Sequence, residues 1–76
     1  MSTPTEIATT ILATALHLKP AEIHEKTALG MSPQWDSLAH MRLILGLEER
    51  LGRQLDPSAI LDISTLADVV KVVEES

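Results

Sequence analysis

The sequence predicts an all-α protein, a small four-helix bundle with three main helices, one short helix and a long first loop. Three observations lead to this fold class. Apolar residues recur every three or four positions in segments that each begin with a residue suited to cap a helix. Proline and glycine fall between these segments, where they interrupt regular structure. No segment combines a period of two with a partner strand, so no sheet is predicted.

The size of the chain limits its architecture. With 76 residues it can bury only about 60% of the surface of its unfolded chain, which suffices for one small core. We therefore predict a single domain over residues 1–76. Hydrophobic residues make up 45% and charged residues 22% of the chain, as in folded soluble domains. The chain has one Trp and no Phe or Tyr, so the core must be mainly aliphatic.

The first helix is predicted to begin after Thr3, a suitable N-cap that is followed by Pro4 at the first helical position and Glu6 in a capping box. It should end near Leu18, because Pro20 disfavours helical geometry in the residue before it. Residues 19–35 then show no sustained period. Connections of this length are usually functional or held down, and we expect Ile23 and Leu29 to dip into the core.

The second helix is predicted from Asp36, a good N-cap, to about Leu51, with Gly52 placed to end it. On a helical wheel its apolar residues form two stripes about 140° apart. The first stripe consists of Leu43, Ile44, Leu47 and Leu51, and the second of Leu38, Met41 and Leu45. One stripe suffices to dock the helix, so the second either faces further core elements or stays exposed for a partner. Met41 is the best candidate for exposure, whereas Leu38 and Leu45 could equally be buried.

Two shorter helices complete the prediction. Asp56 and Pro57 repeat the signal of a cap followed by proline and open a short helix that runs to Leu61. Ser64 or Thr65 caps the last helix. Its inner stripe is predicted to be Leu66, Val69, Val70 and Val73. Gly46 interrupts the second helix at a cost of up to about 1 kcal/mol relative to Ala, without a local reason.

Composition excludes several functional classes. A net charge of −5 argues against nucleic-acid binding, which needs a basic face. The absence of cysteine rules out disulfides, zinc–thiolate sites and a cysteine nucleophile, and the three histidines have no metal-ligand spacing. No apolar run approaches the ~18 residues of a membrane span. The start of the chain has no signal-peptide features, so a cytoplasmic location is expected.

The segment Trp35-Asp36-Ser37-Leu38 follows the long loop and opens the second helix. It resembles the modification site of the acyl and peptidyl carrier proteins, whose shared core is Asp-Ser-Leu. The residues after the serine resemble helix II of these carriers, and residues 63–66, Ile-Ser-Thr-Leu, resemble the beginning of their last helix. The length of the chain and the order of its predicted helices agree, so the resemblance covers the whole chain and implies an acyl-carrier-protein-like fold.

The resemblance implies a carrier without catalytic activity. Ser37 would receive 4′-phosphopantetheine from coenzyme A through a Mg²⁺-dependent phosphopantetheinyl transferase, and the thiol would carry an acyl or aminoacyl group as a thioester. Further partners would be a loading ligase and downstream pathway enzymes. The residues implied at the cofactor site are Ser37, Asp36, Leu38, Trp35, Leu61 and Ile63. The residues implied at the partner face are Leu38, Met41, Arg42 and Leu45.

Physical chemistry agrees with Ser37 as the attachment point. If Asp36 is the N-cap, a phosphodiester on Ser37 lies beside unpaired backbone N–H groups and the positive end of the helix dipole, which favours it by roughly 0.3–1 kcal/mol. Simple capping by both residues is the alternative interpretation. Trp35 and His40 have the spacing of a staple contact, with partial burial of His40. Guidance of the prosthetic arm is a second possible role for Trp35.

Departures from the fatty-acid-synthesis carriers indicate the kind of pathway. Gln34 and Trp35 replace their Leu-Gly, and Arg42, Arg50 and Arg53 offset the acidic residues of the second helix. We therefore expect a freestanding, monomeric carrier in a specialised lipid, polyketide or nonribosomal peptide pathway rather than housekeeping fatty acid biosynthesis.

Two rival functions use the same residues. A small helical interaction module without a prosthetic group would bind through Leu38, Met41 and Leu45 alone. A hydrolase would use Ser37 and His40, which lie three residues apart on one helix face. A chain of this length is too small to supply the oxyanion hole and cleft as well.

Overall fold

The computed structural model describes residues 3–24 and 27–75, and residues 1–2, 25–26 and 76 lie outside this part. The described residues form four α-helices and one short 3₁₀-helix, η1 (Pro20–Glu22). The α-helices are α1 (Pro4–Leu16), α2 (Ser37–Leu51), α3 (Pro57–Asp62) and α4 (Leu66–Glu74). The described residues form no strand, and the predicted all-α bundle is confirmed.

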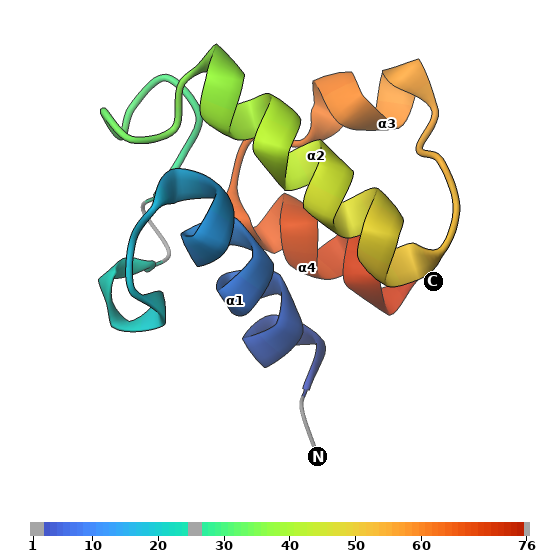
Figure 1. Cartoon of the computed structure of the whole chain (residues 1–76), viewed down its shortest axis with the longest axis horizontal. Helices are drawn as coiled ribbons and strands as arrows, with labels where there is room; N and C mark the ends of the chain where they lie inside the picture. Colours follow the sequence, from blue (N-terminus) through green and yellow to red (C-terminus); the bar gives the residue numbers. More distant parts are fainter. Residues whose placement is uncertain (1–2, 25–26, 76) are drawn as a thin grey trace.

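The helices α1, α2 and α4 form the packed centre of the protein (Figure 1). The helix α1 packs against both α2 and α4, while α3 lies beside α2 at one edge of the bundle. The core is almost entirely aliphatic, as the composition requires. Its largest fully buried side chains are Trp35, Leu12, Leu43, Leu47, Ile63 and Val69.

The two apolar stripes of α2 have different environments. In the first stripe Leu43, Ile44 and Leu47 are buried, and Leu51 is half-buried against the core. The second stripe is exposed: Leu38, Met41 and Leu45 leave 63%, 64% and 63% of their surface accessible. The alternative in which Leu38 and Leu45 are buried is therefore wrong. The reason is that α1, which packs against α2, covers only one side of it.

The start of α1 agrees with the prediction, whereas its end comes two residues early. The Glu6 N–H donates to the Thr3 hydroxyl at 3.1 Å, and the Thr3 N–H donates to the Glu6 carboxylate at 3.4 Å, which completes the capping box. The helix ends at Leu16 because His17 takes a left-handed conformation with φ 57°. This geometry turns the N–H groups of His17 and Leu18 back onto carbonyls of the last turn.

The described part of the long first loop is anchored as expected. Ile23 is buried, and Leu29 is half-buried against the core. The Leu29 N–H donates to the Ser64 carbonyl at 2.8 Å, beside an isolated antiparallel bridge between Ala28 and Thr65. The loop before Ser37 is therefore held against the beginning of α4.

The last two helices differ in how firmly they are fixed. Thr65, rather than Ser64, is the N-cap of α4, and Asp68 completes its capping box. Val69 and Val73 are buried, and Leu66 and Val70 are half-buried. The helix α3 has Asp56 as its N-cap without a side-chain hydrogen bond, and none of its residues is buried.

The structure explains Gly46 in the middle of α2. A Cβ atom at this position would lie 3.2 Å from Cγ2 of Ile11 on α1, which is tighter than ordinary van der Waals contact. Gly46 therefore permits the close approach of α1 and α2, which offsets its low helix propensity.

Candidate functional site

Ser37 lies at the exposed amino-terminal end of α2. Asp36 has an extended backbone, with φ −99° and ψ −174°, and its Oδ1 accepts a hydrogen bond from the Ala39 N–H at 2.8 Å. Asp36 is thus the N-cap and Ser37 the first helical residue, as predicted. Both side chains are exposed. The Ser37 hydroxyl is therefore accessible from solvent.

The backbone around Ser37 suits a negatively charged group. Among the described residues, neither the Ser37 N–H nor the Leu38 N–H has a hydrogen-bond acceptor within the protein. The first turn of α2 contains no acidic residue, and the Asp36 carboxylate at its N-cap accepts the Ala39 N–H. Unpaired N–H groups and the helix dipole both favour an anion at this end. The site therefore fits a phosphodiester on Ser37.

Trp35, His40 and Ile60 form a chain of hydrogen bonds beside the serine. The Trp35 indole N–H donates to Nδ1 of His40 at 3.0 Å, and Nε2 of His40 lies 3.2 Å from the Ile60 carbonyl oxygen. The two rings are stacked, with centroids 6.1 Å apart and planes inclined by 26°. The predicted contact between Trp35 and His40 is confirmed, and so is the partial burial of His40.

These hydrogen bonds assign the tautomer of His40. The indole N–H can only donate and the Ile60 carbonyl can only accept, so Nδ1 must be unprotonated and Nε2 must carry the proton. Both ring nitrogens are therefore engaged with groups other than Ser37. His40 is not placed to act as the base of the hydrolase alternative, which needs a free nitrogen facing the serine hydroxyl.

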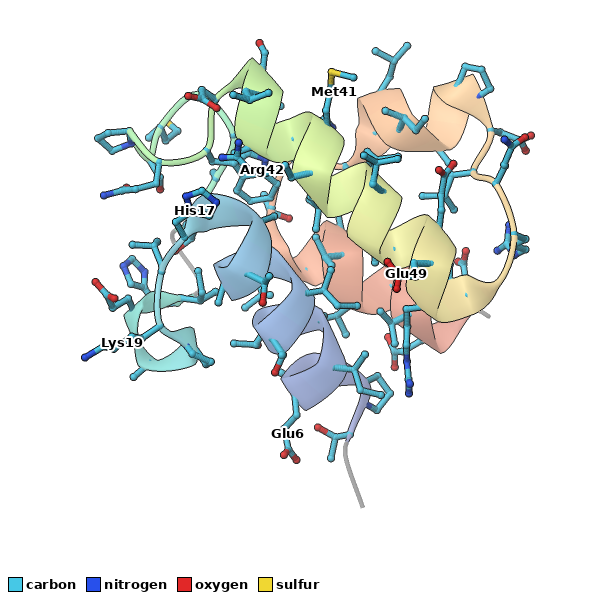
Figure 2. All side chains as sticks on the ribbon, viewed as in Figure 1. Glu6, His17, Lys19, Met41, Arg42 and Glu49 are labelled. Carbon is cyan, nitrogen blue, oxygen red and sulfur yellow. The ribbon has the colours of Figure 1, made fainter. Side chains whose placement is uncertain are left out.

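The apolar residues implied at the site divide into exposed and buried groups. Leu38, Met41 and Leu45 are exposed on α2, and Figure 2 shows Met41 pointing away from the bundle on the outer side of α2. Leu61 on α3 is 83% exposed. Trp35 and Ile63, by contrast, are each only 1% exposed. The accessible apolar side chains of this set thus lie on α2 and α3, whereas Trp35 and Ile63 belong to the buried core.

Arg42 has a structural contact that the sequence does not reveal. Its Nε donates to the Ala15 carbonyl oxygen at 2.9 Å, in the last turn of α1, and the side chain reaches this helix end beside His17 (Figure 2). The last turn of α1 contains no basic residue of its own. Arg42 therefore satisfies a terminal carbonyl and places a positive charge at the negative end of the α1 dipole. Arg42 is therefore expected to contribute to the stability of the bundle, in addition to its implied place on the partner face.

Asp68 fixes the segment between α3 and α4. Its Oδ2 accepts hydrogen bonds from the backbone N–H groups of Ser64 and Thr65, each at 3.0 Å. The bond from the Ser64 backbone is the largest influence on this carboxyl. Together with the other bonds from Ser64 and Thr65 it lowers the pKa of Asp68, although partial desolvation acts in the opposite direction. The ionised Asp68 thereby holds the backbone next to the buried Ile63.

Sequence reasoning missed the acceptors at Ile60 and Ala15, because backbone carbonyls leave no signature in side-chain patterns. The only sign of such an acceptor is an Arg or His that has no evident partner in the sequence and lies on a helix expected to pack near the end of another helix. Among the described residues, no group of three or more His, Asp or Glu side chains is arranged to hold a metal ion. No helix within residues 3–24 and 27–75 is long and apolar enough to cross a membrane.

A small helical bundle that presents a serine at the start of its longest helix has the architecture of a carrier domain. The chain belongs to the family described as the phosphopantetheine attachment site, whose sequence profile matches residues 6–73. The prosthetic group of this family is covalently attached 4′-phosphopantetheine. The expected resemblance to acyl and peptidyl carrier proteins and the expected cofactor are thus confirmed. The comparison with curated proteins gives no match.

Proposed function

We propose that this protein carries an acyl or aminoacyl group as a thioester on 4′-phosphopantetheine attached to Ser37. The observation that carries the proposal is the position of Ser37. It is an exposed hydroxyl at the first position of α2, beside two backbone N–H groups that have no acceptor among the described residues, in a chain of the phosphopantetheine family. The prosthetic group would supply a thiol, which this cysteine-free chain lacks.

Each neighbouring residue has a separate role in the proposal. Asp36 fixes the amino-terminal turn through Ala39 and leaves its second carboxylate oxygen available to the modifying enzyme. Leu38 and Leu61 offer exposed apolar surface to the arm and its cargo. Trp35 and Ile63 support this surface from the core. The protein performs no catalysis itself, and the reactions of the cargo belong to partner enzymes.

The exposed stripe of α2 is the proposed docking face for these partners. Leu38, Met41 and Leu45 are accessible along one side of the helix that begins at the serine. The charges of α2 are mixed, since Arg42 and Arg50 balance Glu48 and Glu49. A mainly apolar face with balanced charge suits enzymes of a specialised lipid, polyketide or peptide pathway better than enzymes that select an acidic helix. The expected monomeric state and cytoplasmic location are part of this proposal.

The deciding experiment is the intact mass of the protein after incubation with coenzyme A, Mg²⁺ and a broad-specificity phosphopantetheinyl transferase. The wild type should gain one phosphopantetheine group, and Ser37→Ala should gain none. If the modified protein is also digested, trypsin cleaves after Lys26 and Arg42 and releases one peptide that contains both Ser32 and Ser37. The mass of this peptide cannot tell the two serines apart, so Ser32→Ala is measured beside Ser37→Ala. Ser58→Ala is the matched control, because Ser58 is also exposed in the first turn of a helix after an aspartate N-cap.

The same experiment distinguishes the carrier from a small interaction module without a prosthetic group. If folded, unmodified wild-type protein gains no mass, the chain is better described as an interaction module that binds through Leu38, Met41 and Leu45. If Ser37→Ala gains the group as readily as the wild type, the attachment point is a different serine.

A further inference from the structure

The residues of α3 by themselves stabilise this helix only weakly. It has six residues, none of them buried, and its N-cap Asp56 makes no side-chain hydrogen bond to the helix. Isolated helices of this length are unstable in water, so the position of α3 depends on contacts with the rest of the bundle. Ile60 supplies the apolar contact, because it packs against the core while half-buried.

A polar contact on the same residue comes from α2. Nε2 of His40 donates to the Ile60 carbonyl oxygen over 3.2 Å, near the carboxyl-terminal end of α3. The same oxygen also accepts the Ile63 N–H at 3.4 Å. The last carbonyls of a helix have no partners within the helix, and a donor from outside stabilises that end. His40 therefore joins α2 to the end of α3 that lies next to it (Figure 1).

The other side of His40 is joined to the loop before the serine. Nδ1 accepts the Trp35 indole N–H, and Trp35 is fixed in the core. The backbone of Trp35 donates to the Ser32 carbonyl and accepts from the Gly30 N–H, so this residue also holds the loop together. The His40 imidazole, three residues after Ser37, thus connects the loop before Ser37 to the carboxyl-terminal end of α3.

We propose that His40 is a positioning residue that fixes α3 relative to Ser37 through its Nε2–H tautomer. Trp35 selects this tautomer by occupying Nδ1 as a donor, and the proton on Nε2 then binds the Ile60 carbonyl. As a result Leu61, next to Ile60, is held as part of one surface with Leu38 and Met41 of α2. The effect on modification rests on the proposed function of Ser37, whereas the effect on α3 does not.

The first part of the test is spectroscopic. At pH 8, above the range in which histidine side chains ordinarily titrate, ¹⁵N chemical shifts of the imidazole should show His40 protonated on Nε2 only. The indole N–H of Trp35, the only tryptophan in the chain, should exchange slowly with solvent. A proton on Nδ1 would overturn the proposal.

Two variants each remove one of the two hydrogen bonds of His40. His40→Asn keeps an acceptor near the position of Nδ1 but does not reach Ile60, whereas His40→Gln keeps a donor near the position of Nε2 but loses the acceptor. We expect His40→Asn to accelerate hydrogen exchange of the α3 amides about three- to tenfold relative to α1 and α4. His40→Gln should leave α3 near the wild type and accelerate exchange of the Trp35 indole N–H instead. His17→Asn is the control, since His17 has a left-handed backbone that asparagine tolerates.

The second part measures phosphopantetheine transfer. His40→Asn should raise the KM of the transferase for the carrier about three- to tenfold with kcat within twofold, and His40→Gln should restore KM. The proposal is overturned if both variants behave alike, because His40 would then act only through packing. It is also overturned if α3 exchange rises while KM stays constant. Absence of modification in the wild type would reject the proposed function of Ser37. The hydrogen-exchange measurements would then still test whether His40 fixes α3.

Discussion

Nε of Arg42 donates a hydrogen bond of 2.9 Å to the carbonyl oxygen of Ala15, which joins α2 to the carboxyl-terminal turn of α1 across 27 residues of sequence. Arg42 points out of the apolar stripe formed by Leu38, Met41 and Leu45 and into the contact between the two helices. A residue that the family resemblance implies at the partner face therefore also joins two helices of the bundle.

Replacing Arg42 should lower stability. We expect Arg42→Gln to reduce the free energy of unfolding by about 1–2 kcal/mol, because the Ala15 carbonyl loses a charged donor at the negative end of the α1 dipole. Denaturant unfolding monitored by circular dichroism measures this change. Arg53→Gln, at an exposed position, is the control and should change stability by less than about 0.5 kcal/mol. Equal effects of the two variants would contradict a specific role for Arg42.

Met41 gives a cleaner test of the docking face than Arg42. It is exposed and points away from the bundle, so Met41→Gln should leave the free energy of unfolding within about 0.5 kcal/mol of the wild type. The KM of the phosphopantetheinyl transferase for the carrier should rise about three- to tenfold, as expected when one apolar side chain is lost from an interface. Steady-state kinetics with varied carrier concentration measure the effect.

The control for Met41 lies on the same helix. Glu49 is exposed near the other end of α2, and Figure 2 shows it far along the helix from Met41. Glu49→Gln should leave KM within about twofold, a change below roughly 0.4 kcal/mol. If Met41→Gln leaves KM unchanged as well, the docking face does not include the exposed stripe around Met41.

Gly46 should tolerate only a very small side chain. Gly46→Ala gains helix propensity but places a Cβ atom 3.2 Å from Ile11, so the two effects largely cancel and stability should change by less than about 1 kcal/mol. Gly46→Val inserts two further carbon atoms between α1 and α2, and we expect a loss of about 1–3 kcal/mol. Thermal unfolding of both variants measures the difference. A Gly46→Val protein as stable as Gly46→Ala would show that α1 and α2 can separate without cost.

Asp68 makes stability depend on pH in a defined direction. The folded state lowers the pKa of Asp68 below its ordinary value of 3.8, so ionised Asp68 stabilises the protein above that pH. This contribution is lost as the pH falls through the folded-state pKa, because the protonated carboxyl no longer accepts the Ser64 and Thr65 N–H groups as strongly. At pH 7 Asp68→Asn should be roughly 0.5–1 kcal/mol less stable than the wild type, a modest value because solvent screens the site.

Measurements at several pH values test whether the contribution of Asp68 depends on its charge. The difference in melting temperature between the wild type and Asp68→Asn should narrow as the pH is lowered from 7 to 3. Asp62→Asn, which alters an exposed carboxylate at the end of α3, is the control. A difference that stays constant or widens with acidity would show that Asp68 does not stabilise the fold through its charge.

The sequence by itself determined the helices and the position of the candidate serine. Thr3 and Asp36 cap α1 and α2, and Gly52 ends α2, because each acts on backbone groups within about four residues of itself. Such local chemistry is readable without a structure. It places Ser37 at the first position of α2, and the surrounding motif identifies the family.

The tertiary structure decided which groups meet across the bundle. The early end of α1 at His17, the space that requires Gly46, and the carbonyl partners of Arg42 and His40 all depend on how helices far apart in the sequence approach each other. Packing chose which stripe of α2 was buried and left Leu38, Met41 and Leu45 exposed. These features follow from contacts of helix faces and backbone carbonyls with distant segments, and the order of side chains along one helix does not reveal which segment each face or carbonyl meets.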